Sequence, residues 1–172
     1  MCNEFKKLEE LEENIKELIK KLNNNQIKGK ERKKIFDDLL EKMGEYLSFM
    51  FEKFIHGNEK IKAEIISSYM LKITQFLGNK NIKITQSKMR KYYNYLLSIS
   101  TLSDNEKLIK ISLLKPYSYY EENRPSGSTF KPIRILLYKI VDEFLKKNNF
   151  DENLFNQTLT FFESLVAYSK TK

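Results

Sequence analysis

The segment KERKKIFDDLLEKMGEYLSFMFEKFI, residues 30–55, decides the fold class, because its apolar side chains recur three or four residues apart along its whole length. This spacing predicts a helix whose inward face carries Ile35, Leu39, Met43, Leu47, Met50 and Phe54. Gly57 is a stop signal after it. Gly44 costs such a helix about 1 kcal/mol relative to alanine, so we interpret it as a place where another helix approaches closely.

The same spacing continues on both sides of this segment. Helices are predicted up to residue 22 and over residues 30–55, 59–77, 85–100 and 132–148. Two more start at residues 103 and 151, and Pro116 is expected to interrupt the first of these. Thr85 and Asp151 are predicted N-caps, Ser103 and Glu106 have capping-box spacing, and Pro132 suits a first helical turn. Residues 124–128 form the clearest loop, and we find no strand pattern and no internal repeat.

These signals predict an all-α fold, a compact helical bundle of five to six helices with an extra N-terminal helix. We divide the chain into an amphipathic helix and linker, residues 1–28, and a helical-bundle domain, residues 29–172. The first helix carries a narrow stripe of the coiled-coil type, made of Leu8, Leu11, Ile15, Leu18 and Leu22. The last helix is apolar over a wide arc and is expected to lie centrally.

Composition excludes several classes of function. One cysteine, Cys2, and one histidine, His56, leave no disulfide framework, no Cys/His zinc site and no ordinary nucleophile–base pair. We therefore expect no enzyme, no metal and no cofactor, and we interpret His56 as a contact with the dipole at a helix C-terminus. The charged N-terminus and the lack of a long apolar run predict a cytoplasmic protein without a membrane partner.

Positive charge is concentrated in the middle of the chain. The formal net charge is +8, and residues 59–100 hold eight basic and two acidic groups, with no acid between Glu64 and Asp104. A high lysine content alone can reflect genome composition, but that explanation does not account for the missing acids. Clustered cations without interleaved carboxylates indicate phosphate binding.

The helix predicted at 85–100 carries this charge on one face. Ser87, Lys91, Asn94 and Ser98 lie opposite its core face, and Lys88, Arg90 and Tyr95 lie on the flanks, where Tyr95 is placed to stack on a base. Four helical residues rise about 6 Å, close to the spacing of phosphates in a stretched strand. Two other interpretations stay open: an ordinary solvated face, and a structural ion pair for Arg90.

A second segment, residues 114–124, mixes three tyrosines with Lys115 and Arg124, as RNA-binding surfaces do. Glu121 and Glu122 dilute its charge, and tyrosines near a helix break often pack with a bonded hydroxyl group. We therefore interpret these tyrosines as structural.

Three blocks of sequence, taken together, resemble a known family. They are Ile84-Thr85-Gln86-Ser87-Lys88-Met89-Arg90, then Leu114-Lys115-Pro116 followed by Tyr120 and Arg124, and last the run from Phe161 to Lys170 (FFESLVAYSK). Their order and spacing are similar to those of the small subunit of the type III-A CRISPR (Csm) effector complex. The resemblance covers about residues 59–170; residues 1–58 are longer than expected for the family, and Ser164 stands where alanine is commoner.

The resemblance implies a small helical subunit, stacked in several copies beside the repeated backbone subunits, that helps line the groove for guide and target RNA while other subunits cleave. Thr85, Arg90, Tyr120 and Arg124 carry over as positions typical of the family. The implied partners are target RNA, guide RNA, other Csm-complex subunits and further copies of the chain itself.

From these observations we predict sequence-independent RNA binding without catalysis. The candidate RNA-binding residues are Lys80, Lys83, Ser87, Lys88, Arg90, Lys91, Asn94, Lys115, Arg124, Lys131 and Arg134. Two alternatives stay open: a DNA-binding regulator that uses 85–100 as a recognition helix, and an assembly adaptor whose leading leucine stripe pairs with another helix.

Overall fold

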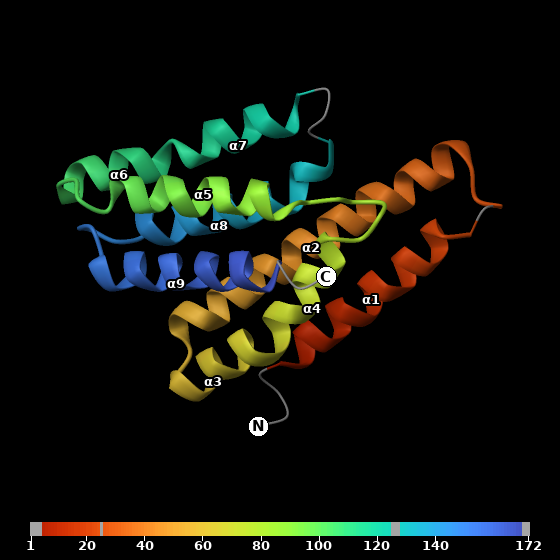
Figure 1. Ribbon diagram of the computed structural model, residues 1–172, viewed down its shortest axis with the longest axis horizontal. Coiled ribbons are helices and arrows are strands. Elements are labelled where there is room, and N and C mark those ends of the chain that lie inside the picture. Colours follow the sequence, from red (N-terminus) through yellow and green to blue (C-terminus); the bar gives the residue numbers. More distant parts are fainter. Residues whose placement is uncertain (1–4, 25, 125–127, 170–172) are drawn as a thin grey trace.

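A computed structural model describes residues 5–24, 26–124 and 128–169, and every element in these ranges is a helix (Figure 1). The α-helices are α1 Lys6–Leu22, α2 Gly29–His56, α3 Glu59–Glu64, α4 Met70–Leu77, α5 Gln86–Ile99, α6 Asp104–Ser112, α7 Leu114–Glu122, α8 Lys131–Leu145 and α9 Glu152–Tyr168. A π-helical turn, Ile65–Tyr69, joins α3 to α4, and a 3-10 turn, Ser128–Phe130, leads into α8. The predicted all-α bundle is confirmed, but the described residues contain more helices than predicted, because a π-helical turn divides the segment 59–77 and a break after Ser112 divides the segment that starts near 103. Cys2, Lys170 and the loop centre at 125–127 lie outside the described residues.

The long helix α2 runs through the molecule and holds its parts together (Figure 1). Its most extensive contacts are with α8 and α1, and it also contacts α3, α4 and α9. Helices α5 and α9 pack against each other, and α7 packs on α8, so α5, α7, α8 and α9 form a group that α2 crosses. None of the described helices is long and apolar enough to cross a membrane.

Helix α1 packs along α2 within the same chain. Leu8, Leu11, Ile15 and Leu22 are buried there and belong to the single hydrophobic core cluster. The stripe is therefore already covered by α2, which removes the free apolar face that pairing with a helix of another chain would need. The domain division at residue 28 stays a prediction.

Gly44 lies where α2 packs closely against α8. A Cβ atom built on Gly44 would lie 2.9 Å from Cβ and 3.1 Å from Cγ1 of Ile135 on α8. The interpretation of this glycine as a helix-crossing position is confirmed. The missing side chain lets two backbones pack more tightly than alanine would allow.

The helix predicted over 59–77 is interrupted. Its first turn is capped by Asn58, whose Oδ1 accepts a hydrogen bond from the N–H of Ile61 at 3.1 Å. At the π-helical turn the N–H of Met70 donates to the carbonyl of Ile65, one residue further back than in an α-helix. Tyr69 and Met70 are consequently both buried, and the Tyr69 ring stacks on Phe5 at 5.0 Å.

The local signals along the chain have mixed outcomes. Ser103 and Glu106 form the predicted capping box, and Asp151 caps α9 by accepting from the N–H of Leu154 at 2.9 Å. The predicted interruption near Pro116 is confirmed, because α6 ends at Ser112 and α7 starts at Leu114. Thr85 occupies the N-cap position of α5, but its side chain accepts no capping hydrogen bond.

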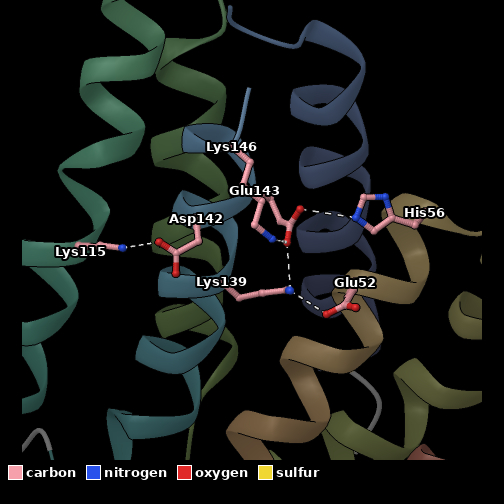
Figure 2. A network of polar contacts seen from close by, with 7 residues as sticks. All are labelled: Glu52, His56, Lys115, Lys139, Asp142, Glu143 and Lys146. Atoms are coloured by element: carbon pink, nitrogen blue, oxygen red, sulfur yellow. Dashed lines mark hydrogen bonds and ion pairs between the residues drawn. The ribbon is translucent and has the colours of Figure 1, made fainter. Parts of the chain in front are cut away.

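A polar network joins the end of α8 to α2 (Figure 2). The Glu143 carboxylate, 5% exposed, contacts Lys146 at 2.7 Å and Lys139 at 3.0 Å, and Lys139 also contacts Glu52 of α2 at 2.6 Å. His56 ends α2, as expected, and its Nε2 lies 3.5 Å from Glu143. Burial would raise the pKa of Glu143, but hydrogen bonds from Lys146 and Lys139 outweigh it and lower this pKa to about 2.

Replacing Gly44 by alanine should destabilise the protein although alanine favours helices. Gly44→Ala should lower the free energy of unfolding by about 1–3 kcal/mol, because the new methyl group overlaps the base of the Ile135 side chain. Urea unfolding measures this. Adding Ile135→Ala removes the contacts beyond Cβ and leaves only the one with Cβ, so Gly44→Ala should cost less in that background; an equal cost in both would contradict the crossing at this position.

Glu143 should make stability depend on acid pH. Because its folded pKa of about 2 lies below its ordinary value of 4.5, its stabilisation is complete above pH 4.5 and is lost as pH falls toward 2. Glu143→Gln should cost about 2 kcal/mol at pH 7, and the difference from the unsubstituted protein should shrink between pH 4.5 and 2. Thermal unfolding over this range measures the effect; a constant difference would contradict the network.

Candidate nucleic-acid interface

The loop between α4 and α5, residues 78–85, is fixed by two buried isoleucines. Ile82 and Ile84 are 1% and 3% exposed, and the N–H groups of Ile82 and Lys83 both donate to the carbonyl of Asn79, at 2.8 and 2.9 Å. Lys83 lies between these two buried residues and is exposed, and so is Lys80. Lys83 has a φ of 54°, in the left-handed region that asparagine and glycine adopt more easily.

Helix α5 is held on α9 and turns a polar face outward. The Gln86 side-chain amide donates to the carbonyl of Val166 at 3.1 Å, which anchors the first turn. Ser87, Arg90 and Asn94 are exposed, and Lys88 is half-buried. The predicted core face is confirmed for Met89, Tyr92, Leu96 and Ile99, whereas Tyr93 is only half-buried.

Four of the candidate cations have no carboxylate partner among the described residues. They are Lys80, Lys83, Lys88 and Arg90, all within one loop and the first turns of the helix that follows it. The structural ion pair considered for Arg90 is therefore not found with any described residue. These groups can meet an external anion without breaking an internal contact.

The lack of acids between Glu64 and Asp104 predicts that no carboxylate lies beside the polar face of α5, and this prediction is wrong. Glu121 of α7 contacts Lys91 at 2.7 Å and Arg124 at 3.3 Å through the same oxygen, Oε1. The hydrogen bond from Lys91 lowers the pKa of Glu121. The acid comes from a residue thirty positions later in the chain, which packing brings beside α5.

Three other candidates are held between helices. Lys115 pairs with Asp142, Lys131 with Glu41 of α2, and Arg134 with Glu122 of α7. The Lys131 and Arg134 side chains are only 24% and 23% exposed. The guanidinium of Arg134 and the ammonium of Lys115 both also lie over the Tyr138 ring, at 5.2 and 5.4 Å.

The tyrosines of α7 are exposed, so their interpretation as packed residues with bonded hydroxyl groups is wrong. Tyr117, Tyr119 and Tyr120 are 49%, 59% and 64% exposed. It is Tyr95 on α5 whose hydroxyl group is bonded, to the carbonyl of Lys110 at 2.8 Å, and its ring meets the Tyr117 ring edge-on at 6.4 Å. Leu114 and Ser118 are the buried residues of α7, and the three tyrosines lie on its remaining, exposed sides.

Two hollows flank the unpaired cations. The first, about 850 Å³, lies where α4, α5 and the end of α9 meet, and Lys80, Lys83 and Ser87 line it. The second, about 480 Å³, is a groove between α5 and α7. Its lining includes four tyrosines of these two helices together with Lys91, Asn94 and Glu121. Within the described residues no group of three or more His, Cys, Asp or Glu side chains is placed to hold a metal ion.

Comparison with known proteins identifies the family. The model of the family Csm2 Type III-A matches residues 60–172, about two thirds of the chain. The chain belongs to the Csm2 Type III-A family. The resemblance found from the three sequence blocks is confirmed. No curated protein and no solved structure matches the chain.

As a Csm2-family protein, the chain is a small subunit of the type III-A Csm complex, and other subunits of that complex are its partners. The matched range starts in α3 and includes the loop at 78–85, α5 and α7. Helices α1 and α2 both precede it entirely, although both contribute to the core.

Substituting two arginines should distinguish a cation that stabilises the bundle from one that only adds charge to the surface. Arg134→Met should lower the free energy of unfolding by about 1–2 kcal/mol, because it leaves the half-buried Glu122 without its partner. Arg90→Met should leave that free energy unchanged, because Arg90 is exposed. Urea unfolding of both variants measures this; equal losses would show that Arg90 also braces the bundle.

Proposed function

We propose that this Csm2-family subunit is non-catalytic and binds the backbone of guide and target RNA through the loop at 79–85 and the outward face of α5. One observation carries the proposal: Lys80, Lys83, Lys88 and Arg90 lie close together in sequence and have no ion-pair partner among the described residues. RNA phosphates would supply the missing counter-charges and release the ions condensed around them.

The start of α5 supports binding of an anion in particular. Thr85 gives no side-chain cap, so N–H groups of the first turn are free of that partner, and the positive end of the helix dipole faces outward. Lys80, Lys83 and Ser87 line the hollow at this end. Ammonium, hydroxyl and backbone N–H groups all donate hydrogen bonds to phosphate oxygens.

The eleven candidate residues divide into three groups on this basis. We assign direct backbone contacts to Lys80, Lys83, Ser87, Lys88, Arg90 and Asn94. Lys91 and Arg124 share one carboxylate and keep a net positive charge, so we assign them a supporting role. The last three would have to break an ion pair with a carboxylate to reach RNA, so we assign them a role in stabilising the bundle: Lys115, Lys131 and Arg134.

Such contacts carry no sequence information, which suits a complex in which pairing with the guide selects the target. Stacking with further copies of the chain remains part of the proposal, as the family resemblance implies. The DNA-regulator alternative gains no support, because residues 78–85 form a longer connection than the tight turn of a helix-turn-helix.

Charge reversal should test the RNA surface. The double variant Lys88→Glu, Arg90→Glu should bind single-stranded RNA more weakly, and the slope of log affinity against log salt should become shallower by about 0.7 for each lost phosphate contact. Fluorescence anisotropy over a salt series measures both quantities, and the melting temperature should not change.

A matched control changes the same amount of charge elsewhere. Lys30→Glu, Lys34→Glu alters two exposed lysines of α2 and should change the salt slope much less. An equal change of the salt slope in both double variants would show that RNA binding depends only on the net charge of the protein. A collapse of melting temperature in the Lys88, Arg90 double would show that these residues are structural.

A further inference from the structure

The groove between α5 and α7 differs chemically from the cationic surface beside it. Tyr117 and Tyr120 are one helical turn apart on α7, and both line it together with Tyr95. Its volume, about 480 Å³, falls in the range of small-ligand sites. The walls are mainly aromatic, whereas the hollow at the start of α5 is lined mainly by polar and basic groups.

Polar groups without partners converge on this groove. Asn94 lines the groove, and no described residue bonds its amide group. Glu121 uses only Oε1 for Lys91 and Arg124, which leaves Oε2 able to accept. A polar ligand in the groove can therefore form hydrogen bonds with the Asn94 amide group and with this second carboxylate oxygen.

The charges around the groove select one part of a nucleotide. Lys91 and Arg124 share the Glu121 carboxylate and keep one net positive charge, which attracts the phosphates that flank a bound base, while the apolar aromatic walls disfavour a phosphate inside the groove. A nucleobase fits between them, because it is neutral and flat and has donors and acceptors along its edge. An apolar side chain of a protein partner would leave Asn94 and the second oxygen of Glu121 unused.

We propose that the groove between α5 and α7 binds one unpaired base of the RNA, stacked against the tyrosines of α7 while Asn94 and Glu121 meet its edge. This rests on the RNA binding proposed above and adds a distinct, uncharged contact to it. The base enters from the same outward face of α5 that carries Arg90 and Asn94, so one strand can place its phosphates on the cations and a base in the groove.

Two RNA oligomers of equal charge isolate this contact. Anisotropy should compare a single-stranded oligouridylate with an abasic oligomer of the same length, which has the same phosphates and no bases. The unsubstituted protein should bind the base-bearing oligomer about 5- to 150-fold more tightly, the range that stacking on an aromatic side chain provides.

Two exposed tyrosines on α7, one that lines the groove and one that does not, provide the variants for this test. Tyr120→Leu should bring the affinity ratio of the two oligomers toward one, whereas Tyr120→Phe should keep it. Tyr119→Leu is the control, because Tyr119 is equally exposed on α7 but does not line the groove. The double variant Lys88→Glu, Arg90→Glu should bind both oligomers more weakly and leave the ratio of the two affinities unchanged.

The outcomes separate the two proposals. If the protein binds both oligomers equally well, or if Tyr119→Leu and Tyr120→Leu lower the ratio alike, the groove is not a base site and backbone binding still stands. If the protein binds neither oligomer, both proposals fail. Circular dichroism of each variant should show unchanged helix content, since the substituted rings are exposed.

Discussion

The close approach of α2 and α8 at Gly44 is the constraint on which the rest of the arrangement depends. With only a hydrogen atom between the α2 backbone and Ile135, α8 lies deep against the longest helix of the described chain. Helix α8 in turn carries α7, through Arg134 with Glu122 and Asp142 with Lys115. The position of α7 then decides which cations of α5 meet a carboxylate. The charge of the α5 surface therefore depends on how helices elsewhere in the bundle pack.

The surface charge is best understood as what remains after internal pairing. The stretch from Glu64 to Asp104 has no acids of its own, but acids from other segments reach some of its lysines: Glu12 pairs with Lys72 and Glu121 with Lys91. Internal pairing uses charge that would otherwise attract a polyanion, and it fixes side chains that would otherwise be mobile. Within this stretch, Lys80, Lys83, Lys88 and Arg90 are left without a carboxylate partner among the described residues, which is fewer cations than the sequence suggests.

Much of the fold could be predicted because its signals are local. Helical spacing identifies the core side chains of α2 and α5, and the capping residues Ser103 and Asp151 mark helix starts within one turn of their partners. Ion pairs such as Lys91 with Glu121 could not be predicted, since they join residues far apart in sequence and depend on helix packing. The exposure of Tyr120 was missed for the same reason: which face of a short helix is buried depends on its neighbour, α8.

The π-helical turn at Ile65–Tyr69 has a consequence for comparing relatives. Its hydrogen-bonded ring encloses one residue more than an α-helical ring does. A relative one residue shorter at this point can close the turn as ordinary α-helix and keep the faces of both flanking segments unchanged. Single-residue gaps in alignments of the family should therefore be placed here, inside a helix, and not pushed into the neighbouring loops.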